Sequence, residues 1–253
     1  MKNMFDLSGK SAIVVGGMGD LGKSMVTALV EAGSKAAIID LPQKLVEIND
    51  MPAEIAKHLY PVEGNIADRK RVESSFKEAL DKIGGHVDIL INAAGIQRRH
   101  PSEEFPLSDW DLVLEINLTA VFRYCQLAAI NMIAHGSGKI INIASMLSFF
   151  GGYTVPAYSA SKGGVAQLTK AFANEWAGKG LNVNAIAPGY MDTNLNVNIV
   201  KDPGRSSEIL ARIPQHRWGL GEDLKGVVVF LASSASDYVN GAIIPVDGGY
   251  LGR

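Results

Sequence analysis

The sequence predicts a doubly wound α/β fold, a single domain with a parallel sheet and helices on both of its faces. Short apolar runs rich in β-branched residues alternate along the chain with longer stretches of helix-like apolar spacing. The short runs are continuously apolar, which is typical of strands buried on both faces and therefore of a parallel sheet. Such strands are joined by right-handed helical crossovers, and no repeat or hydrophilic linker marks a second domain within residues 1–253.

Each expected strand and helix has a local signal. The strand over 59–66 contains Pro61, which is unfavourable inside a sheet. Gly33, Gly84 and Gly180 stand where three helices should end, because glycine readily adopts the left-handed conformation. The other strands are expected at 11–15, 36–40, 87–92, 139–144, 181–187 and 243–246, and the helices at 21–32, 70–83, 109–134, 157–178 and 222–233.

The segment 191–218 departs from this alternation. It is rich in Asn, Ser, Pro and Gly, and it lies between an expected strand and a late helix. Irregular segments of this length inside a compact domain are usually functional. We therefore expect 191–218 to form a loop that acts as a lid over a substrate site.

Composition excludes several classes of protein. Of 253 residues, 47% are hydrophobic and 20% charged, so the chain is neither disordered nor fibrous. No apolar run reaches the roughly 18–20 residues of a membrane span, and no signal-peptide core is present. The net charge of −2 argues against nucleic acid or a membrane surface as partner. A single cysteine, Cys125, favours the cytoplasm, and the histidines lack metal-ligand spacing, so no metal is expected.

A glycine cluster follows the first expected strand and precedes a helix. It reads Gly16-Gly17-Met18-Gly19-Asp20-Leu21-Gly22, and such glycines let the backbone turn sharply and approach a pyrophosphate at the positive end of the helix. Asp40 ends the second strand, where a carboxylate can accept hydrogen bonds from both ribose hydroxyls of NAD. The same carboxylate would repel the 2′-phosphate of NADP. The sequence therefore predicts NAD as the cofactor.

The cluster resembles the Thr-Gly-x-x-x-Gly-x-Gly pattern of the short-chain dehydrogenase/reductase family, whose members have a Rossmann-like fold. Val15 stands at the Thr position, Gly16 is the first glycine and Gly22 the last. Asp20 replaces the middle glycine. Because its carboxylate would compete with the pyrophosphate for the positive helix end, we hypothesise that Asp20 weakens cofactor binding.

Tyr158 and Lys162 are four residues apart, one turn along a single helix face. The lysine charge favours the phenolate and should lower the tyrosine pKa, so that Tyr158 can exchange a proton with an alcohol or ketone. Taken alone, the pair could equally be solvent-exposed. Ser145 lies just past an expected strand, where its hydroxyl could bond the substrate oxygen. With Asn117, which matches a family position linked through water to the lysine, these residues resemble the catalytic Asn-Ser-Tyr-Lys tetrad of the family.

The resemblance covers essentially the whole chain and assigns further residues to the cofactor. Asn92-Ala93-Ala94-Gly95 is similar to the family's Asn-Asn-Ala-Gly, and Thr193 matches a residue that reaches the nicotinamide amide. The complete expected cofactor set is Gly16, Asp20, Leu21, Gly22, Asp40, Asn65, Ile66, Asn92, Ala93, Gly95, Tyr158, Lys162, Pro188, Met191 and Thr193.

Several segments, among them 95–99 and 142–149, are similar to bacterial 2-dehydro-3-deoxy-D-gluconate 5-dehydrogenases, also called 2-deoxy-D-gluconate 3-dehydrogenases. The similarity implies NAD-linked oxidoreduction of a deoxy sugar acid by a homotetramer. Arg98, Arg99 and Arg217 are candidates to bind the substrate carboxylate, because a guanidinium pairs with it through two hydrogen bonds. Alternatively, Arg98 and Arg99 are solvated surface residues, and Arg217 only tethers the lid.

Two other functions remain open from the sequence. The chain could be a dehydrogenase for another polyol or for a 3-oxoacyl thioester, although a thioester substrate would favour NADPH and Asp40 counts against that. It could also be a non-catalytic dinucleotide-binding scaffold. Such a scaffold would be expected to lack Tyr158 or Lys162, and both are present.

Overall fold

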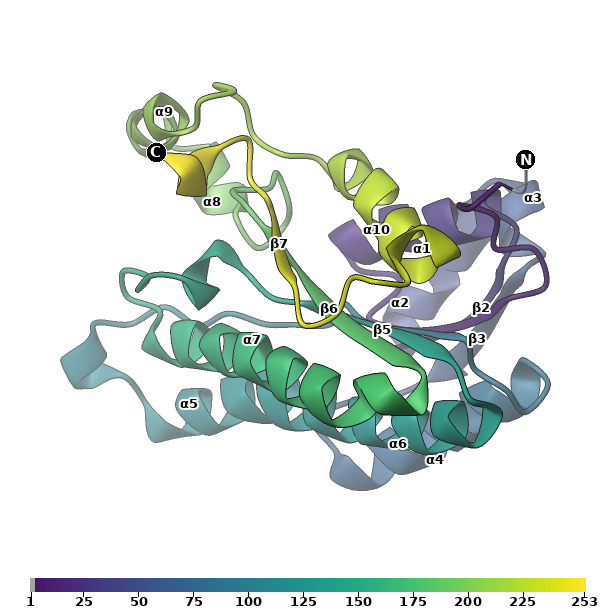
Figure 1. Cartoon of the computed structure of the whole chain (residues 1–253). Coiled ribbons are helices and arrows are strands. Elements are labelled where there is room, and N and C mark those ends of the chain that lie inside the picture. The colour runs from purple at the N-terminus through teal and green to yellow at the C-terminus, as the bar shows by residue number, and fades with distance from the viewer. Residues whose placement is uncertain (1–2) are drawn as a thin grey trace.

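The computed structural model describes residues 3–253 and has a seven-stranded parallel sheet at its centre (Figure 1). The strand order is β3-β2-β1-β4-β5-β6-β7, so the direction of winding reverses between β1 and β4. The predicted doubly wound fold is confirmed. The strands are β1 (Ser11–Val15), β2 (Lys35–Asp40), β3 (Leu59–Glu63), β4 (Ile89–Asn92), β5 (Gly138–Ile143), β6 (Leu181–Pro188) and β7 (Ile243–Val246).

Burial explains why these segments are strands. All residues of β1 and of β4 are buried, as expected of central strands covered on both faces. β3 lies at the edge of the sheet and ends at Glu63, three residues earlier than expected. Pro61 is tolerated in it because an edge strand has neighbours on one side only.

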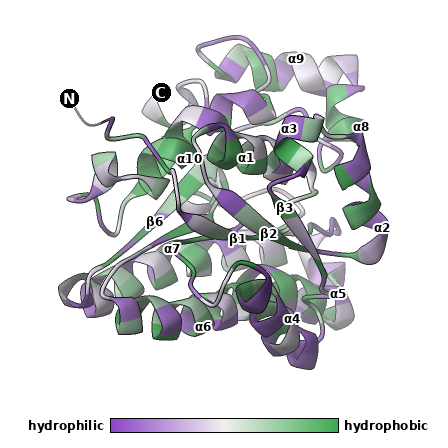
Figure 2. Ribbon diagram, turned by 90° about the vertical axis from the view of Figure 1, so that its right-hand side faces the viewer, coloured by the Kyte–Doolittle hydropathy of each residue, from purple (hydrophilic) through white to green (hydrophobic). Residues whose placement is uncertain are grey.

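Two helical layers cover the sheet (Figure 2). Apolar residues of α4, α6 and α7 pack with one face, and those of α1 and α10 pack with the other. Gly33, Gly84 and Gly180 have the positive φ angles expected at helix ends. The helices are α1 (Asp20–Glu31), α2 (Pro42–Leu45), α3 (Ala53–Ala56), α4 (Arg69–Lys82), α5 (Leu107–Leu114), α6 (Ala120–His135), α7 (Pro156–Trp176), α8 (Val197–Val200), α9 (Pro203–Arg212) and α10 (Lys225–Ala232).

The helix expected at 109–134 is interrupted. A π-helical turn, Glu115–Thr119, separates α5 from α6 and widens the helix at Asn117. Among the described residues, the whole stretch Leu107–His135 is long and apolar enough to cross a membrane by length and composition. Its buried residues, such as Tyr124 and Met132, belong to the core against the sheet, as in the core helix of a globular domain.

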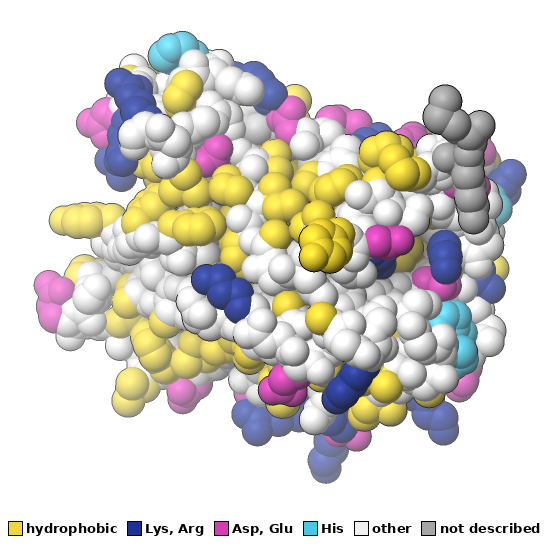
Figure 3. Space-filling model, viewed as in Figure 1, with side chains coloured by type: hydrophobic (Ala, Val, Ile, Leu, Met, Phe, Trp, Pro, Cys, Tyr) yellow, Lys and Arg dark blue, Asp and Glu magenta, His cyan; other side chains and the backbone are white. Residues whose placement is uncertain are grey.

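The segment 191–218 is more ordered than the sequence indicated. It contains α8 and α9, so the expectation of an irregular loop is wrong for these residues. The signal was present, because Asp202-Pro203 is a helix start, with Asp202 accepting a hydrogen bond from the backbone N–H of Arg205 at 3.0 Å. Figure 3 shows hydrophobic side chains between the part of the molecule that carries α8 and α9 and the rest of the domain. A small apolar cluster there joins Met146, Ile209, Ile213 and Tyr250.

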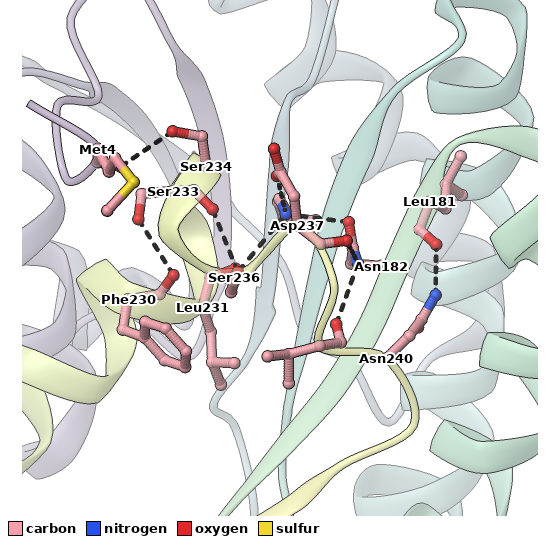
Figure 4. Close-up of polar contacts among 12 residues, drawn as sticks. Met4, Leu181, Asn182, Phe230, Leu231, Ser233, Ser234, Ser236, Asp237 and Asn240 are labelled. Atoms are coloured by element: carbon pink, nitrogen blue, oxygen red, sulfur yellow. Dashed lines mark hydrogen bonds and ion pairs between the residues drawn. The ribbon is translucent and has the colours of Figure 1, made fainter. Parts of the chain in front are cut away.

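Asparagine side chains hold the segment 233–242, which connects α10 to β7, against β6 (Figure 4). Asn182 donates to the carbonyl oxygens of Asp237 and Val239, both at 3.0 Å. Asn240 donates to the carbonyl oxygen of Leu181 at 2.9 Å. These bonds fix the short edge strand β7 against β6 and so place the C-terminal residues beside the 191–218 segment.

Candidate active site

The predicted catalytic residues meet at the carboxyl ends of β4 and β5, where ligands bind in sheets of this kind. Ser145 follows β5 by two residues, and Tyr158 and Lys162 lie on α7. Asn117 comes from the π-helical turn, and Gly95 from the loop after β4. A Cβ added to Gly95 would lie 3.4 Å from Asn117 Oδ1 and 3.7 Å from Lys162 Nζ, so the backbone of this loop passes directly over both side chains.

Lys162 is a buried cation. Its side chain is 4% exposed, and Nζ donates to the carbonyl oxygen of Ile143 at 2.6 Å. Burial lowers the pKa of the ammonium group to about 8. Nζ lies 5.7 Å from the centre of the Tyr158 ring, close enough for its charge to act on the phenol.

Tyr158 faces Ser145. In this structure burial raises the pKa of the Tyr158 phenol above its usual value of 10.0, while the Ser145 hydroxyl and the Arg99 charge act in the opposite direction. The sequence predicted a lowered pKa, and that prediction is wrong for the protein alone, because desolvation of the phenolate outweighs the nearby donors and charges. Tyr158 is therefore a protonated acid in the free protein.

Asn117 holds the loop that carries Gly95. Its amide accepts from the backbone N–H of Ile96 and donates to the carbonyl oxygen of the same residue, both at 2.8 Å. Nδ2 also donates to Ser161 Oγ at 3.2 Å, which links the loop to α7. The fully buried Asn117 thus joins three segments around the lysine.

The glycine cluster forms the predicted tight turn between β1 and α1. Gly16 has a φ of +77°, and a Cβ added there would lie 2.5 Å from the backbone nitrogen of Ala94. A Cβ on Gly22 would overlap the carbonyl oxygen of Gly16. Only glycine fits either position, so the backbone at the start of α1 stays accessible to a phosphate group.

Asp40 ends β2 and is linked to the glycine cluster. Its Oδ2 accepts from the backbone N–H of Met18 at 2.9 Å, and its Oδ1 accepts from that of Leu41 at 2.8 Å. Partial burial raises the pKa of this carboxyl, against the effect of the two backbone donors. The Asp40 carboxylate therefore lies at the carboxyl end of β2, next to the glycine cluster that joins β1 to α1.

Asp20 is the first residue of α1, but its carboxylate does not cap the helix. Gly19 is the N-cap residue, and both Asp20 oxygens instead accept hydrogen bonds from Asn194. The backbone N–H of Asn194 donates at 2.7 Å and its Nδ2 at 2.9 Å. The carboxylate is thus directed at the 191–218 segment rather than at the end of the helix.

The remaining predicted cofactor residues divide into two groups. Asn92 points into the core, where Nδ2 donates to Asn142 Oδ1 at 2.9 Å and to Cys125 Sγ at 3.3 Å, so its side chain does not reach the glycine cluster. The others lie along the same edge of the sheet. The N–H of Ala93 donates to the carbonyl oxygen of Val15, and Leu21 is half-buried on α1. Asn65 and Ile66 follow β3, Pro188 ends β6, and Met191 and Thr193 are at the start of the 191–218 segment.

The three candidate arginines differ in their partners. Arg98 is engaged by Asp109, with Nε 3.6 Å from Oδ1, and Arg217 pairs with Asp223 through two contacts of 2.7 Å. Arg99 donates to Gln97 Oε1 at 3.2 Å rather than to a carboxylate. The Arg217 pair supports the alternative in which this residue tethers the lid.

Arg99 is held at the mouth of the site. The backbone N–H of His100 donates to the carbonyl oxygen of Thr154 at 3.1 Å, which fixes Arg99 beside the loop that leads to Tyr158. Arg99 is exposed overall, but partial desolvation lowers the pKa of its guanidinium, and the positive charge of Arg205 lowers it further. Arg205 lies on α9, one turn before the buried Ile209. The sequence did not point to Arg205, because its position on a helix facing the site depends on how the 191–218 segment folds.

A buried lysine, a protonated tyrosine, a serine hydroxyl and Arg99, which donates to a neutral amide, therefore lie at the same edge of the sheet as the phosphate-binding turn. Such a site can donate a proton to a carbonyl, or remove one from an alcohol, while it holds an anionic substrate.

Comparison with known proteins agrees with this arrangement. Residues 18–251 match a family model described as enoyl-(acyl carrier protein) reductase. The chain is 47% identical over 250 residues to the 2-dehydro-3-deoxy-D-gluconate 5-dehydrogenase of Escherichia coli (strain K12), with 98% of each chain covered.

Solved structures are similar over the same length. A protein of Agrobacterium tumefaciens with bound NADP shares 45% sequence identity and a TM-score of 0.90, with 100% of both chains covered. The gluconate 5-dehydrogenase of Burkholderia cenocepacia J2315, solved with NADP and tartrate, shares 36% identity and a TM-score of 0.90, over 99% of this chain and 98% of that one.

Proposed function

Since the chain belongs to the short-chain dehydrogenase/reductase family, we propose that it is an NAD-dependent dehydrogenase of a deoxy sugar acid of the 2-dehydro-3-deoxy-D-gluconate type. The observation that supports this most is the position of Arg99 at the mouth of the site that holds Tyr158, where it pairs with no carboxylate among residues 3–253. The relatives named for this activity match 98–99% of the chain.

The roles of the catalytic residues follow from their contacts. Tyr158 transfers the proton to the substrate oxygen, and Ser145, which faces the phenol, holds that oxygen in place. The ammonium group of Lys162 stabilises the phenolate that forms, and Asn117 fixes the loop above it. A bound nicotinamide supplies or accepts the hydride. The cofactor residues given above would place its pyrophosphate at the glycine cluster and its ribose near Asp40.

Asp40 supports NAD over NADP. Three similar structures hold NADP, one of them at low occupancy. In this chain a partly desolvated carboxylate stands at the end of β2, and a 2′-phosphate beside it would bring two negative charges together. We expect a higher kcat/KM with NAD, and at least about a tenfold loss of that preference in Asp40→Ala. A preference of the unmodified enzyme for NADP would contradict this assignment.

Arg99 and Arg205 are suited to the substrate carboxylate. Each has a like charge as neighbour, so an anion between them would relieve the repulsion. The Arg205 guanidinium pairs with Glu208 in an exposed ion pair, which costs little to break. Because Arg205 lies on α9, a carboxylate bound by both side chains would draw the 191–218 segment over the site, as expected of a lid.

Substrate class is tested with purified protein and a panel of sugar acids, neutral polyols and a 3-oxoacyl thioester, with NADH or NADPH absorbance as the readout. We expect turnover of the deoxy sugar acid with NAD. Turnover of neutral polyols or of the thioester alone would support the second type of dehydrogenase. Coenzyme binding without turnover of any compound would support the non-catalytic scaffold.

A face of α6 and α7 supports the expected homotetramer. Phe122 and Ile130 on α6 are 41% and 65% exposed, and an apolar hollow of about 470 Å³ lies between the two helices. Pairing of this face with a second copy would remove the apolar surface from water. We expect a tetramer in sedimentation equilibrium and dissociation to smaller species in Phe122→Glu. A monomeric wild-type protein would contradict the proposal.

The free, buried thiol of Cys125 is compatible with the cytoplasm, where we place the enzyme.

A further inference from the structure

Asp20 makes a contact that a glycine at its position could not make. Both of its carboxylate oxygens accept hydrogen bonds from Asn194, one from the backbone and one from the side chain. The two residues are 174 positions apart, and they join the first turn of α1 to the beginning of the 191–218 segment. The contact therefore links the phosphate-binding turn to the expected lid.

The two ends of the 191–218 segment, which we call its root, are joined by backbone hydrogen bonds that do not involve Asp20. Gly219 donates to the carbonyl oxygen of Tyr190 at 2.9 Å, and the N–H of Asp192 donates to the carbonyl oxygen of Gly219 at 2.8 Å. The chain that follows the root also contacts α1, where Ser24 Oγ lies 3.4 Å from Glu222 Oε1. α1 thus contacts the chain on both sides of the root, at Asn194 through Asp20 and at Glu222 through Ser24.

Fixing Asn194 also fixes Thr193. The residues after the root form a compact turn in which the N–H of Asn196 donates to the carbonyl oxygen of Thr193 at 2.9 Å. Asn196 Nδ2 donates to the carbonyl oxygen of Met191, also at 2.9 Å. A shift of Asn194 away from α1 would therefore move Thr193 with it.

We propose that Asp20 is a positioning residue whose carboxylate latches the 191–218 segment onto the coenzyme-binding helix and holds Thr193 over the nicotinamide site. The proposal rests on the coenzyme site described under the proposed function. Asp20 is exposed and next to the position of the pyrophosphate, so the two Asn194 donors also direct its negative charge away from that group. The earlier hypothesis is thereby changed: Asp20→Gly should weaken coenzyme retention instead of strengthening it.

The first test needs no coenzyme. Hydrogen exchange is measured on the free protein, in peptides that cover residues 194–206. In Asp20→Ala we expect about 3- to 10-fold faster exchange there, as for the loss of hydrogen bonds to a charged group, with unchanged exchange in β1 and β4. Glu222→Gln is the matched control, because it removes a negative charge near α1 without contact to Asn194. Unchanged exchange in Asp20→Ala would overturn the latch.

The second test measures coupling between the partners. NADH dissociation is followed by stopped-flow fluorescence in Asp20→Ala, in Asn194→Ala and in the double variant. We expect each single change to speed NADH release about 3- to 10-fold, and the double variant to be no faster than Asp20→Ala. Independent effects that multiply, or slower release in Asp20→Ala, would overturn the proposal. A protein that binds NADH and shows this coupling but oxidises no sugar acid would keep the latch and reject the proposed substrate.

Discussion

The floor of the active site and its rim are built differently. The floor consists of Asn117, Ser145, Tyr158 and Lys162, held by short bonds between buried segments of the core. The rim consists of Arg99 and the arginines of the 191–218 segment, where Arg99, Arg205 and Arg217 have partly exposed or exposed partners only two to six residues away along the chain. The comparison indicates that the chemistry is fixed by the fold, whereas the choice of substrate depends on contacts that can rearrange.

The largest effect is expected on the floor. Tyr158→Phe removes the proton donor and should lower kcat about 10²- to 10⁴-fold, because general acid–base catalysis contributes that much. The dissociation constant of NADH should stay within about twofold, since the phenyl ring keeps the volume of the site. Steady-state kinetics and fluorescence titration measure the two. An unchanged kcat would show that another group transfers the proton.

Lys162→Met should raise the thermal stability of the protein below pH 8 while it abolishes activity. Burial lowers the lysine pKa in the folded protein to about 8, so between about pH 8 and 10.5 the unfolded chain binds more protons and wild-type stability rises with pH. Below pH 8 the buried charge is costly, and the variant should unfold about 2–4 °C higher while its activity is lost.

Thermal unfolding of Lys162→Met from pH 7 to pH 10 checks this dependence on protonation. The gain over the wild type should shrink as the pH rises through 8. A variant that is less stable than the wild type at pH 7 would show that the bond to the carbonyl of Ile143 outweighs the cost of burial.

The floor could be predicted from the sequence because its residues are set by local spacing. Tyr158 and Lys162 share a helix face, and Ser145 follows a strand whose end is fixed by the sheet. On the rim, Arg99 and Arg217 were candidates from the sequence, but Arg205 could not be predicted, since its place depends on α9 packing through Ile209 against Met146. The direction of the Asn92 side chain could not be predicted, because a side chain at a strand end can point into the core as well as along the edge.

A glycine of the phosphate-binding turn gives a smaller effect, which is measured on stability. Gly16→Ala should destabilise the fold by about 3 kcal/mol, because the residue has a positive φ and its Cβ would collide with Ala94. Gly9→Ala is the matched control, with a φ of +79° and no atom of residues 3–253 within 4 Å of an added Cβ, and it should cost only about 1 kcal/mol. Urea unfolding compares the two. Equal losses would mean that Ala94 can move away, and the close approach would lose its importance.

Arg205, on the rim, should give the smallest effect. Arg205→Ala is expected to raise KM for the sugar acid about 3- to 10-fold with little change in kcat, because this guanidinium binds substrate without touching the reacting atoms. Arg212→Ala serves as a control, since that guanidinium packs 4.8 Å over the Tyr250 ring. A loss in kcat alone would assign Arg205 to lid movement instead of binding.

The sugar-acid assignment is tested most directly by comparing a deoxy sugar acid with its uncharged methyl ester in wild type, Arg99→Leu and Arg98→Leu. We expect Arg99→Leu to lower kcat/KM for the acid about 10- to 100-fold and for the ester less than twofold, so that the preference for the acid collapses. Arg98→Leu should keep the preference, because Arg98 is paired with Asp109. Equal losses on acid and ester in Arg99→Leu would contradict recognition of the carboxylate by this residue.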